Sequence, residues 1–241
     1  MGEIRMYDQR IDGRGFDELR PIAAKTGVIK KADGSAMFKI GNTIAYAAVY
    51  GPRDLYPRFL QDPGKGILRC RYNMMPFSGA GDRVRPASRR SKEISLVTGK
   101  ALLPAVNLSE FPNAVVDVFV ELPQTDAGTR CAGICAAAMA LADAGVAMRD
   151  LVSSVACGRV ENSIVVDLNY GEESYSEDVA DIPIAVMPRS GTVTLLQMDG
   201  LVSPAELRKA LEVASDACKR IFEVQKAALK ERFELVEMKG V

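Results

Sequence analysis

The stretch "QTDAGTRCAGICAAAMALADAG" (residues 124–145) places Gly-Thr-Arg directly before a run made almost wholly of small apolar residues. Its last residue, Gly145, is of the type that commonly follows a helix C-terminus. We therefore predict a helix that begins near Thr129 and stops at Gly145.

Strand-like and helix-like segments alternate on both sides of this helix. A helix is predicted over residues 89–103 with Ser88 as its N-cap, and another from the capping box Ser203–Glu206 to about Glu234. Turn signals and runs of apolar or alternating residues predict strands over 41–52, 67–77, 114–122, 151–160, 163–170, 181–188 and 192–200. The sequence therefore indicates a mixed α/β (α+β) protein in which helices separate groups of strands.

The composition is that of an ordinary globular protein. The chain has 241 residues, 48% of them hydrophobic, and no repeat or break in composition, so a single domain over residues 1–241 is expected. No apolar run approaches the roughly 18 residues of a membrane span, and the charged N-terminus holds no apolar signal core. Five scattered cysteines without a CxxC pair indicate reduced thiols. We expect a soluble, cytoplasmic protein with no membrane contact.

The chain contains no histidine, which restricts its chemistry. Ser-His and Cys-His nucleophile pairs and imidazole metal ligands are excluded, together with the most common general base. Any reaction must therefore use Asp, Glu, Lys, Arg or Tyr side chains, or a bound ion.

The residues Gly128, Thr129 and Arg130 at the start of the central helix suit a tetrahedral anion. A helix N-terminus presents free backbone amides and the positive end of the helix dipole, and an arginine adds a planar fork that matches phosphate. The same residues also fit a simple helix start with an arginine in solvent, and taken alone they favour that interpretation.

Local charge adds a second and a third signal. Five cations lie between residues 83 and 93, among them Arg89 and Arg90, and five acids lie between residues 171 and 181 with no base among them. The arginines can follow a nucleic-acid backbone, although both segments also fit solvated surface. Carboxylates near a phosphate site repel the substrate unless they hold Mg²⁺ or Mn²⁺. Taken together, the three signals indicate phosphoryl transfer on a polyanion.

Several stretches, in order along nearly the whole chain, resemble the RNase PH family. They are "RIDGRGFDELRPI" (10–22), "GNTIAYAAVYGPRD" (41–54), "LRCRYNMMPFS" (68–78), "RRSKEIS" (89–95), "GTRCAGICAAAMALADAG" (128–145) and "TLLQMDG" (194–200). Within the family, the last stretch is most similar to the catalytic ring subunit of archaeal exosomes.

The resemblance implies a fold, an assembly and a reaction. The fold is the ribosomal protein S5 domain 2-like RNase PH fold, with mixed sheets packed against helices. The assembly is a hexameric ring in which this subunit alternates with an inactive RNase PH-like sibling, with RNA-binding cap subunits above it. The reaction is phosphorolysis, a 3′→5′ exoribonuclease activity in which inorganic phosphate is the co-substrate and nucleoside diphosphates are released.

The resemblance also implies roles for individual residues. Residues 128–130 correspond to the phosphate-binding loop, and Arg89 and Arg90 to the pair that binds the 3′-terminal RNA phosphates. Tyr72 corresponds to an aromatic residue on which a base stacks, and Arg58 to a residue near the neck of the ring. Asp181 matches an aspartate that the family uses with its metal, Mg²⁺ or Mn²⁺.

This chain differs from the family at the position of the general acid. The family has an aspartate about six residues before Asp181, but this chain has Tyr175 there. Asp178 is our prediction for the acid and second metal ligand, with Glu173 as the alternative. A free-standing RNase PH that trims tRNA 3′ ends, and an inactive subunit that only positions RNA, are the alternative functions.

Overall fold

The computed structural model describes residues 7–79, 85, 87–176 and 178–239, the last five of these by their backbone alone. Its larger sheet has the strand order β1–β2–β3–β5–β4. These strands are β1 (Ile22–Thr26), β2 (Gly34–Ile40), β3 (Thr43–Asp54), β4 (Ile67–Met74) and β5 (Ala114–Gln124). Only β4 and β5 pair in parallel, so the sheet is mixed.

The smaller sheet is antiparallel and has the order β7–β6–β8–β9. It consists of β6 (Ser153–Val160), β7 (Ser163–Val166), β8 (Val179–Met187) and β9 (Thr192–Leu196). Three short helices lie in connections: η1 (Arg58–Leu60), η2 (Leu108–Glu110) and α3 (Tyr170–Glu173). The connection from β7 to β8 contains α3 and most of the acidic segment 171–181.

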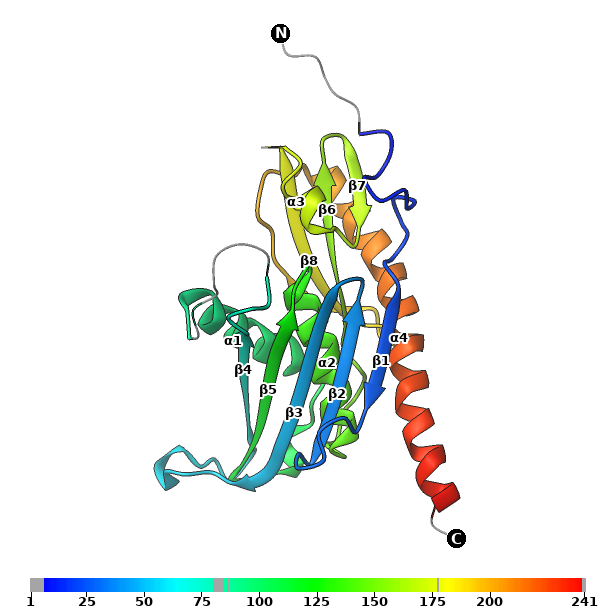
Figure 1. The fold of residues 1–241 in the computed structure, drawn as a ribbon. Coiled ribbons are helices and arrows are strands. Elements are labelled where there is room, and N and C mark those ends of the chain that lie inside the picture. Colours follow the sequence, from blue (N-terminus) through cyan, green and yellow to red (C-terminus); the bar gives the residue numbers. More distant parts are fainter. Residues whose placement is uncertain (1–6, 80–84, 86, 177, 240–241) are drawn as a thin grey trace.

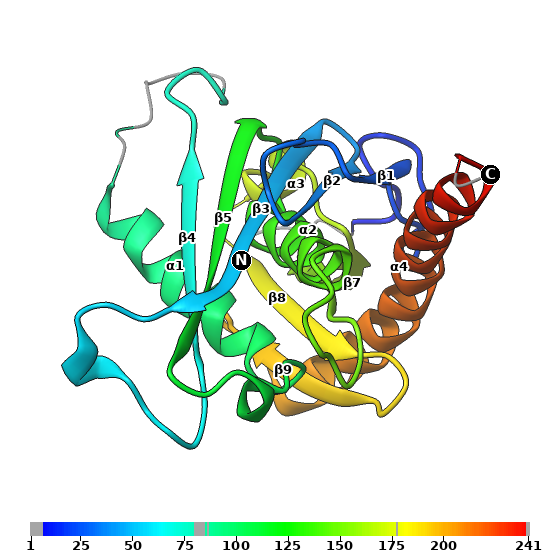
Figure 2. The ribbon, with the colours of Figure 1, turned by 90° about the horizontal axis from the view of Figure 1, so that it is seen from below.

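Helix α2 (Thr129–Asp143) is the centre of the molecule and lies between the two sheets (Figures 1 and 2). Its small side chains let strands approach it from several sides, and nearly all of its residues are buried. A Cβ atom added at Gly133 would lie 3.2 Å from the Val120 side chain and 3.4 Å from the Tyr72 ring. The single large core cluster accordingly includes residues of both sheets.

Two further helices cover the outside. Helix α1 (Arg89–Leu102) packs against β4, and its N-cap Ser88 accepts a hydrogen bond from the Ser91 amide. Helix α4 (Pro204–Lys239) runs along β1 and the smaller sheet, and Ser203 and Glu206 form its capping box. None of the described helices combines the length and the apolarity needed to cross a bilayer.

The three predicted helices are confirmed, and each predicted strand overlaps a strand of the structure. Strands β1 and β2 and helix α3 are absent from the prediction. The segment 163–170 was expected to be one strand, but β7 ends at Val166 because Asp167 has a φ of 56° in the left-handed region. The chain then enters α3, whose N-cap is Asn169.

Candidate active site

A cavity of about 1040 Å³ opens at the N-terminus of α2. The larger sheet contributes the loop after β5, α1 contributes its first turn, and the smaller sheet contributes β8 and α3. Among the residues that line the cavity are six candidates from the sequence: Arg90, Gly128, Thr129, Arg130, Glu173 and Asp181. The fold therefore brings the basic segment, the Gly-Thr-Arg motif and part of the acidic segment to one place.

The loop that leads into α2 is held in an unusual backbone conformation. Ala127 and Gly128 have φ values of 52° and 61°, both in the left-handed region that favours glycine. Gly128 is the N-cap, and no side chain caps the helix there. The amides of the first turn of α2 thus have no side-chain cap at the cavity, as an anion site requires.

Arg130 is held at the wall of the cavity by weak contacts. Its guanidinium donates to Gln197 at 3.3 Å and lies 3.9 Å from the Glu93 carboxylate. Its Nε is buried and has no hydrogen-bond partner among the described residues. A buried donor without a partner is costly, so this arginine is suited to an anion that completes its hydrogen bonds.

Two carboxyl groups in the cavity lining have raised pKa values. Burial, and then the charge of Asp181, raise the pKa of Glu173 to about 7, against the opposing effects of Arg90 and the Gly128 amide. Burial also raises the pKa of Asp181 to about 6, where Arg130 opposes the shift and Asp199 adds to it. Glu173 is therefore a carboxyl group that can donate a proton near neutral pH.

The structure does not bring Asp178 into the cavity. Its side chain is 61% exposed and forms an ion pair with Arg159, which lowers its pKa. A lowered pKa is the opposite of what a general acid needs. The structure thus departs from the prediction at this position, because α3 turns the chain so that Glu173 faces Asp181 and Asp178 faces outward.

Tyr72 and Arg58 do not line the cavity. Tyr72 is only 3% exposed, and its ring packs against Gly133, so no ring face is open to a base. Arg58 lies in the connection from β3 to β4, at the end of β4 remote from the cavity. The eight residues of β4 correspond to about 26 Å of separation. Arg89, in contrast, is exposed in the first turn of α1, next to Arg90.

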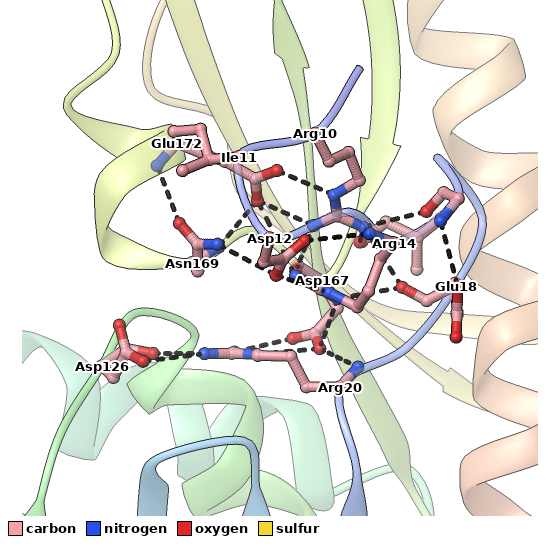
Figure 3. Close-up of polar contacts among 12 residues, drawn as sticks. Arg10, Ile11, Asp12, Arg14, Glu18, Arg20, Asp126, Asp167, Asn169 and Glu172 are labelled. Carbon is pink, nitrogen blue, oxygen red and sulfur yellow. Dashed lines mark hydrogen bonds and ion pairs between the residues drawn. The ribbon is translucent and has the colours of Figure 1, made fainter.

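A buried ionic network lies next to the residues that line the cavity, and Figure 3 shows its polar contacts. Arg10 donates two hydrogen bonds of 2.7 Å to Glu172, and both side chains have no exposed surface. Arg20 donates to both carboxylate oxygens of Asp167, at 2.9 and 2.7 Å, and its other terminal nitrogen donates to the Asp126 carbonyl. The N-terminal segment therefore connects α3 with the loop that precedes α2.

Neither this network nor α3 was predicted from the sequence. The sequence does contain a signal for the short helix, because Asn169 and Glu172 have the spacing of a capping box. In the structure the Asn169 side chain accepts from the Glu172 amide, and the Glu172 carboxylate accepts from the Asn169 amide. That helix start would have placed Glu173 in a defined first turn.

Comparisons with known proteins show the family and the fold of the chain. The 3′ exoribonuclease family, domain 1, matches residues 18–147, and domain 2 of the same family matches residues 150–217. The chain is 50% identical over 225 residues to "Exosome complex component Rrp41" of Methanopyrus kandleri, with 93% of each chain covered. It is 51% identical over 234 residues to the protein of the same name from Pyrococcus abyssi, covering 95% of this chain and 93% of that protein.

Solved structures show the same fold. The "archaeoglobus fulgidus exosome with RNA bound to the active site" matches with a TM-score of 0.77 and 26% identity, covering 90% of this chain and 92% of the other. Rice Rrp46 matches with a TM-score of 0.78 and 25% identity, covering 91% and 100%. Fold and family thus define a 3′ exoribonuclease.

The chain belongs to the RNase PH family of 3′ exoribonucleases. The predicted family, RNase PH fold and phosphorolytic 3′→5′ exoribonuclease activity are confirmed. A single domain over residues 1–241 stays a prediction.

Proposed function

We propose that the cavity at the N-terminus of α2 is the place where inorganic phosphate attacks the 3′ end of RNA. One observation carries this proposal. The N-terminus of α2, without a side-chain cap, and Arg130, whose Nε has no partner among the described residues, line the same cavity as Glu173, whose pKa is raised to about 7. An anion site next to a proton donor is what phosphorolysis requires. Phosphate binds to the amides of the loop, to Thr129 and to Arg130.

The reaction balances without a protein nucleophile. An oxygen of the bound phosphate attacks the phosphorus of the terminal phosphodiester, the bond from that phosphorus to the 3′ oxygen breaks, and a nucleoside diphosphate leaves. Protonated Glu173 gives its proton to the departing 3′ oxygen, and the shortened RNA keeps a 3′ hydroxyl. The protein contributes position and charge, as in other phosphoryl transfers.

Arg90 and Arg89 bind the RNA backbone in this proposal. Arg90 lines the cavity, and Arg89 is exposed beside it on the same helix. The first turn of α1 contains no acidic residue, so neither charge is offset by a carboxylate within that turn. Such contacts with phosphates give affinity that is independent of sequence and falls with salt.

We also propose that a divalent metal, Mg²⁺ or Mn²⁺, binds at Asp181. Oδ1 of Asp181 is buried without a hydrogen-bond partner among the described residues, and the neighbouring Asp199 also lines the cavity. No group of three His, Cys, Asp or Glu side chains in the described residues forms a ready-made metal site. Mg²⁺ commonly binds through one or two carboxylates plus phosphate oxygens, so these residues fit it. When bound, the metal neutralises charge on the phosphates.

The assembly and its location are part of the proposal. Relatives with about 50% identity are named exosome components, and one structural match is an exosome with RNA bound. We infer that this chain alternates with an inactive sibling in a cytoplasmic hexameric ring with RNA-binding caps. Native mass spectrometry of the chain, with and without a co-expressed sibling, checks this, because a homohexamer of the chain alone would instead identify a free-standing RNase PH.

The reaction is tested by its requirements and products. The protein, with its sibling subunit if one is required, is expected to degrade RNA only when inorganic phosphate and Mg²⁺ or Mn²⁺ are present, and to release nucleoside diphosphates. Chromatography of the products after incubation with and without phosphate, and with EDTA, makes the measurement. Nucleoside monophosphates in phosphate-free buffer would contradict the proposal.

Two sets of variants separate the roles within the cavity. Arg130→Ala is expected to lower turnover by about 10²–10³-fold while RNA affinity changes little, because it removes a donor to the attacking phosphate. Arg89→Ala with Arg90→Ala is expected to weaken RNA binding and to reduce its salt dependence. Equal RNA affinity in the double variant and the wild type would remove these arginines from the RNA site.

A further inference from the structure

Asp126, which neither the motif nor the proposed chemistry uses, lies where the loop before α2 meets α3. Its side chain lines the cavity and is 24% exposed. It is the first residue of the segment 126–128, which leads into the predicted phosphate-binding residues 128–130 and which we call the phosphate loop. A carboxylate this close to an anion site repels the anion, so its presence needs a compensating role.

The contacts of Asp126 connect three separate parts of the chain. Oδ1 accepts from the Tyr170 amide in the first turn of α3 at 3.2 Å. Oδ2 accepts from the side chain of Asn42, in the turn before β3, at 3.1 Å, and lies 3.8 Å from Arg20. Both carboxylate oxygens are thus used by groups of the protein.

The backbone amide and carbonyl of Asp126 are both hydrogen-bonded as well. Its carbonyl accepts from Arg20 and from the Thr43 hydroxyl, and its amide donates to the same hydroxyl at 2.9 Å. Arg20 in turn is fixed by Asp167, as Figure 3 shows. The phosphate loop therefore has a rigid support on its inner side. The Asp126 carboxylate connects it to the backbone of α3, in addition to the Gly128 amide, which acts on the Glu173 side chain.

We propose that Asp126 is a positioning residue that fixes the phosphate loop against the helix that carries Glu173. This inference rests on the proposed function of the cavity. This link sets the distance between two groups of the reaction. One is the set of backbone amides at the start of α2 that hold phosphate, and the other is the Glu173 carboxyl group. Misplacement of a reacting group by about 1 Å can cost about 10²-fold in rate.

Two explanations of Asp126 predict opposite signs for one measurement. If the carboxylate were only a charge in the cavity, Asp126→Asn would remove repulsion and lower the KM for phosphate. If it is the link between loop and α3, Asp126→Asn raises the KM for inorganic phosphate and lowers kcat. The substitution replaces one accepting oxygen with a donor NH₂ group, and it removes the negative charge beside Arg20. We expect the second result, with an increase of about tenfold in the phosphate KM and an unchanged KM for RNA.

A matched control and a milder variant complete the experiment. Asp33 is an exposed aspartate whose carboxylate also accepts a backbone amide, that of Gly51, at the other end of β2. Asp33→Asn is expected to leave both KM values unchanged. Asn42→Ala removes one contact of Asp126 without changing the charge, and it is expected to shift the phosphate KM in the same direction by a smaller factor. It tests the link independently if Asp126→Asn folds poorly.

Isothermal titration with inorganic phosphate distinguishes a failure of the proposed function from a failure of the positioning role. If the wild-type complex binds no phosphate, the proposed function fails and this inference fails with it. If the wild type binds phosphate and Asp126→Asn binds it equally or more tightly, only the positioning role is overturned. A change in the RNA KM alone would also overturn it, since Asp126 would then contact RNA.

Discussion

Glu173→Gln is expected to lower the rate of phosphorolysis by about 10²–10⁴-fold while leaving the affinity for phosphate nearly unchanged. Glutamine keeps the shape of the side chain but has no proton to give to the departing 3′ oxygen. Single-turnover kinetics on a short RNA at saturating phosphate measure the effect. Asp178→Asn is the matched control, because Asp178 is exposed and paired with Arg159, and it is expected to keep nearly full activity.

The pH dependence of the same variant gives an independent check. Because the pKa of Glu173 is raised to about 7, the wild-type rate is expected to fall as the pH rises through that value, where the carboxyl group loses its proton. Glu173→Gln is expected to lose this alkaline limb. A wild-type limb that persists in the variant, or a loss of activity in Asp178→Asn of similar size, would assign the acid elsewhere.

Glu173→Gln is expected to increase the stability of the folded protein at alkaline pH, although it lowers the activity. The folded state binds a proton at Glu173 more tightly than the unfolded state, so this group costs stability as the pH rises from 4.5, the ordinary pKa of a glutamate, to about 7. Glu173→Gln removes that cost. We expect the variant to be more stable than the wild type at pH 8 by about 1–2 kcal/mol, measured by urea denaturation.

Arg10→Met is expected to lower the free energy of unfolding by about 3–5 kcal/mol, because it removes both arginine hydrogen bonds to the buried Glu172 carboxylate and leaves only Arg14, at 3.9 Å, as a cation nearby. Burial alone would raise the pKa of Glu172, but the hydrogen bonds from Arg10 lower it in the folded protein. Without Arg10 the carboxyl group is expected to be protonated more easily. The loss of stability is therefore expected to be smaller at pH 5 than at pH 8, which urea denaturation at both values checks.

A second variant shows whether charge or packing causes this loss. Arg10→Met combined with Glu172→Gln also removes the carboxylate that Arg10 pairs with, so the double variant is expected to be more stable than Arg10→Met alone. Lys219→Met, which breaks an exposed ion pair on α4, is the control and is expected to have no measurable effect. Equal losses at both pH values would indicate that Arg10 acts through packing.

Local rules explain why the helices and several site residues were predictable. Ser88, Gly145 and the pair Ser203 and Glu206 are helix signals that do not depend on the rest of the fold, and the structure bears them out. The Gly-Thr-Arg motif is similarly local. Strand β2 contains Gly, Ser and Ala, and its position depends on its neighbours, because Gly34 packs directly against the end of α2. No local pattern records such a contact.

The uncertain site residues depended on tertiary structure. The choice between Glu173 and Asp178 turns on the path of the connection from β7 to β8. Because α3 places Glu173 in the cavity lining and Asp178 lies outside it, the geometry favours Glu173 in our proposal. Tyr72 shows a different limit. The alternation of residues along β4 places Tyr72 on the same side as Leu68, Cys70 and Met74. That side packs against helices, so the Tyr72 ring is covered.

The small side chains of α2 affect the width of the cavity at its N-terminus. This helix lies between the two sheets and contacts both of them. Its first turn lines one part of the cavity, and strand β8 of the smaller sheet lines another. Tightly packed interiors do not absorb added volume. Because α2 is rich in Ala, Gly and Cys, its small diameter sets the spacing of the two sheets and thus the width of the cavity. A larger side chain in the buried part of α2 is expected to move the cavity walls apart without touching them.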